Sequence, residues 1–460
     1  MKARSRRVDA SIRALSLLLS LAAVGSSALA ADPFASNNGL YPSASAWQGP
    51  FRSLSYNYPS GADNGWRRVA PREPLSIANA EAYINTLKTY LAPSMRGMIE
   101  TPNDWDPAKN RWFDMPWMGS GQSTGTGVDP MSGREAILGA FSGQTLLQET
   151  FAASGLKVDM QNHTVIYYDS MAAEMLGKLW ANPFNPDRSG VSFPEGAMVV
   201  KAAGVTPTPE QWPILEGSTI WKVFRPAVED TRGPTHDPKS EASKAKVLDL
   251  RVLQFDIIVK DSLASPQTGW VFTTFVYDKD APGGGTWDKL VPLGAMWGND
   301  PKFANEPGGT DPNGGPLQET WINPAAPKYA QATLGWGGRL SGPIDVAERH
   351  NVLLTNGQNV PVQRASSCLS CHGTAQFPFV ANLYPSPNKT FPPEGQTFPM
   401  YVPGSDMWAR WFQNRAGSIP QNPNKGAVAL DYDMLIMFAL SAFDAAAGND
   451  VYVQDHADVH

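Results

Sequence analysis

Five consecutive residues, Cys368-Leu369-Ser370-Cys371-His372, constrain this chain more than any other stretch. They spell C-x-x-C-H, which is the attachment motif of a c-type haem. On one turn of helix, two thiols three residues apart can each form a thioether with one of the two haem vinyl groups. The residue that follows presents its imidazole to the iron as the proximal ligand. The motif therefore predicts one covalent haem c, tethered by Cys368 and Cys371, with His372 as an iron ligand.

Other interpretations of the same two cysteines are weaker. A C-x-x-C pair in an exported protein can form a small-loop disulfide or a thioredoxin-like redox pair. A structural zinc site needs two more ligands at matching spacing, and the chain has no further cysteine. Because only six histidines occur in 460 residues, a histidine directly after C-x-x-C is rarely a coincidence. Haem attachment is therefore the favoured interpretation.

The N-terminus has the pattern of a secretory signal peptide. An apolar stretch at 14–24 is too short for a comfortable membrane span, and Ala28-Leu29-Ala30 supplies a small-x-small cleavage site. We therefore expect a signal peptide over residues 1–30 and a periplasmic or otherwise exported protein. Export agrees with haem attachment, which bacteria complete outside the cytoplasmic membrane. Five basic residues precede the apolar stretch: Lys2, Arg4, Arg6, Arg7 and Arg13.

The charge of the mature chain limits its partners. Removal of residues 1–30 takes away five basic side chains and one acid, which leaves 32 Lys and Arg against 42 Asp and Glu, a formal net charge of −10. This balance argues against nucleic acid and anionic lipid as partners. It favours a redox partner protein with a basic docking patch. Nothing after residue 30 is apolar enough to predict a membrane span.

The length and composition predict more than one domain. A chain of 460 residues suggests two or three domains, and its 41 Gly and 40 Pro favour short strands and many turns. We expect an α+β fold. Residues 31–345 are predicted to form an antiparallel β-rich N-terminal domain with flanking helices. Residues 346–460 are predicted to form a mainly α-helical, cytochrome c-like haem domain.

Hydrophobic periodicity indicates the main elements. A repeat of three or four residues predicts helices near 76–92, 169–180 and 430–443, and helical stretches are also expected near 134–154 and 408–415. Alternation with a period of two predicts strands at 198–201, 219–224, 253–259 and 270–276. No helix-length segment separates most of these strands, which favours an antiparallel sheet over βαβ units. Lys201 lies in an apolar strand, and we expect its amine to extend to a sheet edge rather than to act in catalysis.

The second axial ligand of the iron would decide whether the protein transfers electrons or binds a small molecule at the iron. Methionine as second ligand gives a closed iron suited to electron transfer, whereas an open position allows small ligands to bind. Met407 lies between the haem motif and the last predicted helix, where small cytochromes c usually carry this methionine. Met118, in a Trp- and Met-rich stretch, is an equally ranked candidate. The weaker candidates are His163 and His350, and the methionines assigned to the core of the last helix are Met434 and Met437.

Together with the haem motif, several short segments resemble those of exported bacterial monohaem cytochrome c-like proteins. The resemblance covers most of the mature chain and implies haem binding and electron transfer, but no substrate. Apart from the haem motif, these segments imply no reaction. The segments are Met115-Pro116-Trp117-Met118, Gly133-Arg134-Glu135, Phe193-Pro194-Glu195-Gly196, Lys201-Ala202-Ala203, Gly269-Trp270 with Thr274-Phe275, Trp297-Gly298-Asn299-Asp300, and Ser367 to His372.

The sequence therefore favours a periplasmic one-electron carrier over an enzyme. The alternatives are a haem enzyme, peroxidase-like or oxidising a small molecule, and a haem-based ligand sensor with an open axial site. The large N-terminal domain, which a simple carrier does not need, supports the alternatives. Against an enzyme, the chain has no second haem motif and no evident Ser-His-Asp or paired-carboxylate constellation.

Overall fold

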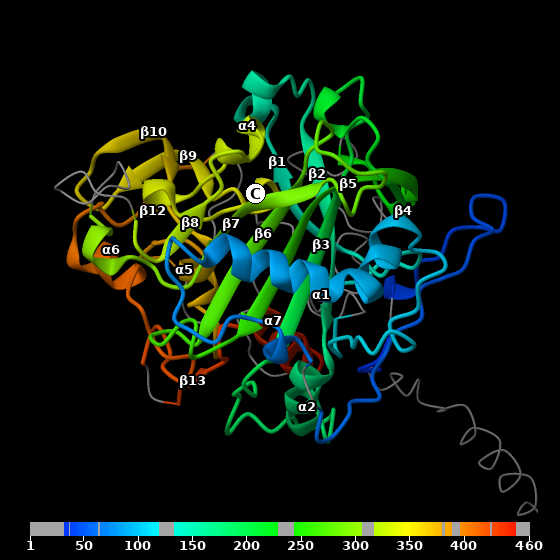
Figure 1. Ribbon diagram of the computed structural model, residues 1–460, viewed down its shortest axis with the longest axis horizontal. Coiled ribbons are helices and arrows are strands. Elements are labelled where there is room, and N and C mark those ends of the chain that lie inside the picture. Colours follow the sequence, from blue (N-terminus) through cyan, green and yellow to red (C-terminus); the bar gives the residue numbers. More distant parts are fainter. Residues whose placement is uncertain are drawn as a thin grey trace, which may run out of the picture. The chain divides into compact units, whose positions relative to one another are not determined.

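A large antiparallel sheet organises the fold (Figure 1). A computed structural model describes residues 32–35, 37–62, 65–118, 133–228, 243–305, 317–379, 382–388, 396–423 and 426–447. From Pro33 onward, these described residues belong to a single folded unit. The predicted signal peptide, residues 1–30, lies outside the described residues. The predicted domain boundary near residue 345 stays a prediction.

The sheet has eight strands in the order β1-β2-β3-β5-β6-β7-β8, and β4 pairs with the first residues of the long strand β5. Neighbouring strands in this sheet are antiparallel, as the period-two pattern predicted. The strands are β1 (Phe141–Leu146), β2 (Met160–Tyr168), β3 (Met198–Val205), β4 (Ile220–Arg225), β5 (Lys246–Lys260), β6 (Trp270–Tyr277), β7 (Leu290–Met296) and β8 (Thr320–Ile322).

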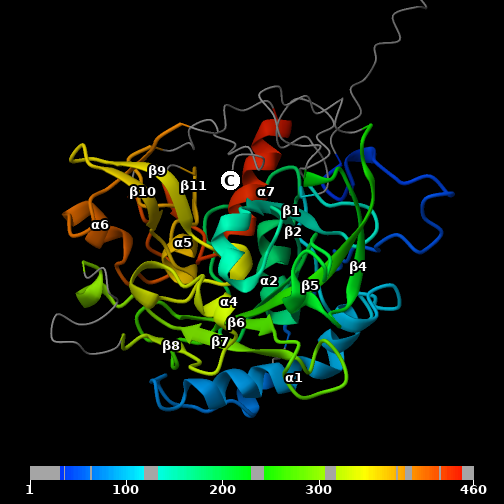
Figure 2. The same ribbon diagram turned by 90° about the horizontal axis from the view of Figure 1, so that it is seen from above.

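The two faces of the sheet have different partners. Helix α1 (Ala80–Glu100) packs along one face, and its Ile84, Leu87 and Leu91 join the main hydrophobic core with residues of β2, β3, β5 and β6 (Figure 2). Side chains alternate along a strand, so each strand serves both faces. On β2, Val165 belongs to this core, whereas Thr164 borders a cavity on the opposite face. Residues of the C-terminal segment line the other side of that cavity.

The predicted fold class is wrong for the C-terminal segment. The described parts of residues 346–460 do not form a mainly α-helical cytochrome c-like domain, because short strands outnumber helices there. In β9, Val352 and Leu354 are buried and Leu353 is exposed, which is a strand pattern that the prediction overlooked. The elements are β9 (Glu348–Leu354), β10 (Asn359–Arg364), α5 (Cys368–His372), β11 (Gln376–Phe377), β12 (Phe398–Met400), α6 (Asp406–Trp411), β13 (Val428–Ala429) and α7 (Met434–Ala446).

The predicted helices differ in how well they match the structure. The helix expected near 134–154 is wrong, because residues 141–146 form β1, which pairs with β2, and Gln148–Ser154 is a 3-10 helix. Helix α2 (Ser170–Leu179) lies where predicted, and its N-cap Asp169 accepts a hydrogen bond from the Ala172 backbone. A short helix, α4 (Lys328–Gln331), was not predicted. None of the helices in the described ranges is long and apolar enough to cross a membrane.

Candidate haem site

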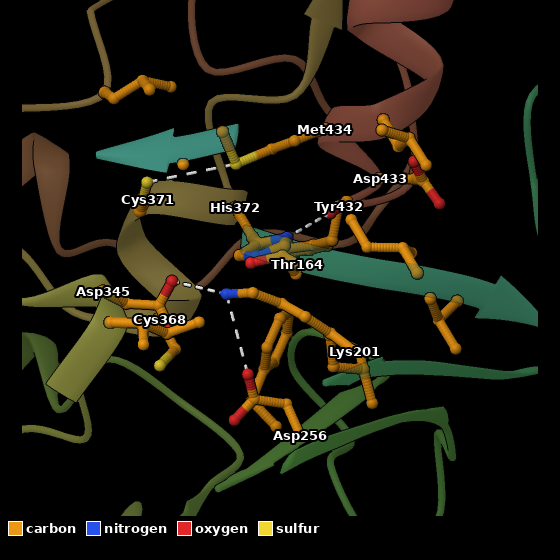
Figure 3. A pocket seen from close by; sticks show the side chains of 18 of the residues that line it. Thr164, Lys201, Asp256, Asp345, Cys368, Cys371, His372, Tyr432, Asp433 and Met434 are labelled. Atoms are coloured by element: carbon orange, nitrogen blue, oxygen red, sulfur yellow. Dashed lines mark hydrogen bonds and ion pairs between the residues drawn. The ribbon is translucent and has the colours of Figure 1, made fainter. Parts of the chain in front are cut away.

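A cavity of about 320 Å³ lies between the sheet and the C-terminal segment. Both cysteines and the histidine of the haem motif border it (Figure 3). Strands β2, β3, β5 and β6 form one wall, and the residues before and within α7 form another. The volume falls in the range of small-molecule and cofactor sites. Among its apolar lining side chains are Ile166, Val199, Ile258, Phe272, Leu383, Leu435 and Phe438.

The haem motif forms a single helical turn, α5, that its serines hold in place. Ser367 is the N-cap, and its hydroxyl accepts from the Ser370 backbone at 3.3 Å, while the Ser370 hydroxyl accepts from the Ser367 backbone at 3.0 Å. This reciprocal capping box satisfies two backbone donors that the helix leaves open. Leu369 and Ser370 face the protein interior. The turn therefore presents Cys368, Cys371 and His372 to the cavity.

The His372 ring is held in a tautomer that can bind a metal. Its Nδ1 lies 2.9 Å from the Tyr432 carbonyl oxygen, and because a carbonyl oxygen can only accept, Nδ1 carries the proton. Nε2 of the neutral ring is then unprotonated, which is the form that binds a metal. Desolvation by the surrounding protein lowers the pKa of His372 to about 4, so the ring stays neutral near pH 7. Phe272 of β6 packs against the ring at a centroid distance of 4.8 Å.

The two thiols are poor candidates for a redox pair. Desolvation raises the pKa of Cys371 to about 12, and it raises that of Cys368 well above its ordinary value. A thioredoxin-like pair depends on a thiolate of lowered pKa, whereas these thiols remain protonated. The Sγ atom of Cys371 lies 4.0 Å from the Sδ atom of Met434. The surroundings therefore favour thiols that attach a haem over thiols that take part in disulfide exchange.

A partly buried ionic group lies on the wall of the cavity. Lys201 of β3 forms an ion pair with Asp345 and lies 3.6 Å from Asp256 of β5. Gln254 donates to both carboxylates, at 2.7 Å to Asp345 and 2.8 Å to Asp256. Desolvation alone would lower the pKa of Lys201, but the two carboxylates outweigh it and raise the pKa. Desolvation raises the pKa of Asp256 to about 6, against the opposing effect of Lys201.

The expectation that Lys201 extends to a sheet edge is therefore wrong. Strand β3 lies inside the sheet between β2 and β5, and the Lys201 side chain is only 19% exposed. Its main partner, Asp345, comes 144 residues later in the chain, so no local pattern could reveal the pair. The apolar neighbours of Lys201 in β3 identified the strand but not the ion pair.

The residues present fit a covalently attached haem. Two thiols and a neutral, oriented imidazole project from one helical turn into a largely apolar cavity, which is the donor set and environment that haem c requires. The described residues contain no cluster of three or more His, Cys, Asp or Glu arranged to hold a metal ion by itself. Cys368 and Cys371 would hold the porphyrin and His372 its iron.

The structure separates the candidates for the second axial ligand. Met118 borders the cavity, whereas Met407 of α6 is 43% exposed and is not among the residues that line it. His163 also lies away from it, because it precedes Thr164 on β2 and faces the opposite side of the sheet. His350 lies near Glu149 and Glu348 instead. The structure therefore places Met118 on the same cavity as His372 and leaves Met407 outside it.

Two residues at this site were missed as functional candidates. Met434, assigned to the helix core, is the first residue of α7 and borders the cavity next to Cys371. Its position directly after the N-cap Asp433 was the available signal, because a first-turn residue is less enclosed by its own helix. Tyr432 acts through its backbone carbonyl, which no side-chain pattern can reveal.

No family model matches the chain, and comparison with curated proteins and with solved structures found no similar protein. The assignment of this site therefore rests on the haem motif and on the geometry around it.

Proposed function

We propose that the protein binds one haem c through Cys368 and Cys371, with His372 on the iron, and transfers electrons in the periplasm. The observation that carries this proposal is the hydrogen bond from His372 Nδ1 to the Tyr432 carbonyl, in a cavity that both cysteines share. A random C-x-x-C-H sequence would have no reason to place these groups together. When bound, the haem supplies reversible one-electron exchange at its iron.

The residues of the chain would hold and insulate this group. The capped turn fixes the two attachment points, and the Tyr432 carbonyl fixes the tautomer and direction of the imidazole. Phe272 packs against the imidazole, which restricts its rotation. Most of the lining surface is apolar, and both burial and hydrogen bonding to the ligand tune a haem potential. The formal net charge of the mature chain, −10 after loss of residues 1–30, favours a redox partner with a basic docking patch.

One observation favours a second candidate function, a haem enzyme or ligand sensor with an open axial site. Asp256, with its pKa raised to about 6, borders the cavity beside Lys201 and Asp345. A buried acid that titrates near ambient pH is suited to deliver a proton to a bound small molecule. A simple electron carrier has no need of such a group at its haem.

Attachment is tested by exporting the full chain in a host with c-type haem maturation. We expect the wild-type protein to keep haem on a denaturing gel, and the double variant Cys368→Ala/Cys371→Ala to lose it. Met407→Ala, an exposed change outside the cavity, is the control and should keep it. Covalent haem in the double variant, or none in the wild type, would refute the assignment.

The two functions are separated by absorption spectra of the oxidised, reduced and CO-treated protein. A low-spin spectrum that CO does not change supports the electron carrier, because both axial positions are then filled. A high-spin iron that takes CO readily supports the enzyme or sensor instead.

A further inference from the structure

The turn that orients His372 has an unusual backbone. Asp431 and Tyr432 are consecutive non-glycine residues with positive φ, at 49° and 68°. This left-handed region disfavours residues with a Cβ atom, and such conformations persist only where the surroundings enforce them. The carbonyl of Tyr432, which accepts from His372 Nδ1, lies within this strained turn. We call residues 431–433 the ligand turn. Contacts with neighbouring segments must stabilise its strained backbone.

The Asp431 carboxylate anchors the ligand turn to the sheet. One oxygen accepts from Lys260 Nζ of β5 at 2.6 Å and from Trp270 Nε1 of β6 at 2.8 Å. The other oxygen accepts from the Phe193 backbone at 2.8 Å. The Asp431 side chain is only 1% exposed, so these contacts are shielded from water and from screening by salt. Three segments of the β-rich region therefore converge on one carboxylate.

The rest of the ligand turn is held in a similar way. The Tyr432 hydroxyl donates to the Arg415 carbonyl at 2.8 Å. The Asp433 carboxylate accepts from Tyr168 Oη of β2 at 2.8 Å and from the Ile436 backbone, which makes it the N-cap of α7. Contacts from β2, β5 and β6 therefore fix the turn on both sides of the Tyr432 carbonyl.

We propose that the β-sheet sets the electron-donating strength of His372 by holding the ligand turn, with Asp431 and Lys260 as positioning residues. This inference rests on the proposed haem function. A hydrogen bond from Nδ1–H to a carbonyl raises the basicity of Nε2, and a more basic ligand stabilises oxidised iron. By keeping the Tyr432 carbonyl in place, the sheet lowers the reduction potential. The large N-terminal region thereby has a role that a small carrier lacks.

Two variants separate this role from simple electrostatics. Asp431→Asn removes a negative charge and Lys260→Met removes a positive charge, so a purely electrostatic effect raises the potential in the first and lowers it in the second. The positioning role requires the potential to rise in both, because each loosens the same carbonyl. The positioning role also requires the His372 Nδ1 proton to exchange with water faster in both variants than in the wild type. The expected factor is about tenfold, which corresponds to the loss of one ordinary hydrogen bond.

The matched control is Asp444→Asn. Asp444 is a buried acid that pairs with Arg188 at 2.6 and 3.0 Å. It lies on α7, about three helical turns beyond the ligand turn. The variant reports the effect of losing one buried negative charge, and it should leave Nδ1 exchange unchanged. Potentials are measured by redox titration and proton exchange by NMR, on the full haem-loaded protein.

The outcomes decide between positioning and electrostatics. A raised potential and faster Nδ1 exchange in Lys260→Met support the positioning role. If Asp431→Asn does not accumulate as folded protein, Lys260→Met alone is sufficient for the test. A lowered potential with unchanged exchange in Lys260→Met overturns the positioning role while the haem assignment stands. Absence of covalent haem in the wild type, established first by gel staining, refutes the proposed function and this inference with it.

Discussion

Replacement of His163 by glutamine should change how the stability of this protein depends on pH. His163 lies on β2 with its side chain fully buried, and the Ser142 hydroxyl lies 3.3 Å from its Nδ1. Desolvation, together with the nearby positive charge of Arg225, lowers the pKa of His163 from 6.5 to about 3. The folded protein therefore keeps this ring neutral where the unfolded chain would protonate it.

The sign and size follow from proton linkage. Between pH 6.5 and about 3 the unfolded chain binds one more proton at His163 than the folded protein does, so stability falls as the pH falls. The loss is about 1.4 kcal/mol for each pH unit below the unfolded pKa. At about pH 5 it amounts to about 2 kcal/mol relative to about pH 8. Glutamine does not titrate, so His163→Gln should lack this part of the acid sensitivity.

Urea unfolding of the wild type and of His163→Gln at about pH 8 and pH 5 measures the effect. The difference in unfolding free energy between the two proteins should move by about 2 kcal/mol in favour of the variant on acidification. His350→Gln, which removes a ring that is 31% exposed, controls for loss of an imidazole as such. Parallel pH curves for the wild type and His163→Gln would refute the reasoning. Because His163 faces away from the cavity, the haem spectrum should not change.

Two further predictions concern the cavity and the motif. Met118→Leu should alter the absorption spectrum of the haem protein and Met407→Ala should not, because Met118 borders the cavity and Met407 does not; a change in Met407→Ala alone would contradict this. Gly335→Ala should lower the unfolding free energy in urea by about 2 kcal/mol or more, because the added Cβ would lie 1.9 Å from the Ser366 carbonyl oxygen, one residue before the N-cap of the haem motif. Unchanged stability in this variant would mean that the backbone near Gly335 shifts to accommodate the Cβ atom without loss of stability.

The sequence predicted the sheet better than it predicted the C-terminal segment. Strands 270–276 and 253–259 have long period-two patterns rich in Val, Ile, Phe and Thr, and both lie within observed strands. Residues 134–154 lack such a clear period, and their pairing with β2 is a tertiary contact that propensity does not encode. In the C-terminal segment, β11 and β13 have two residues each, too few for any period to show. The presence of the haem motif was taken to imply a helical surrounding that it does not require.

The candidate site shows the same difference between local patterns and distant contacts. The haem attachment predicted for Cys368, Cys371 and His372 depends on spacing within five residues, so it needs only the sequence, and it stays a prediction. What surrounds them comes from far away in the chain, as the pair of Lys201 with Asp345 shows. Local patterns carry no information about such pairs, and a backbone carbonyl such as that of Tyr432 has no sequence signature.

The distribution of these distant contacts gives the β-rich region a physical reason to exist. A capped one-turn helix is enough to present two thiols and an imidazole, but it does not determine how strongly that imidazole donates to a metal. That property depends on the ligand turn, whose strained backbone is held by Tyr168, Lys260 and Trp270. All three belong to strands that the main core fixes from the other face of the sheet. If the proposed haem site is right, stability of the core and tuning of the haem ligand are coupled through the same strands, so changes that loosen the sheet should also change the electronic properties of the site.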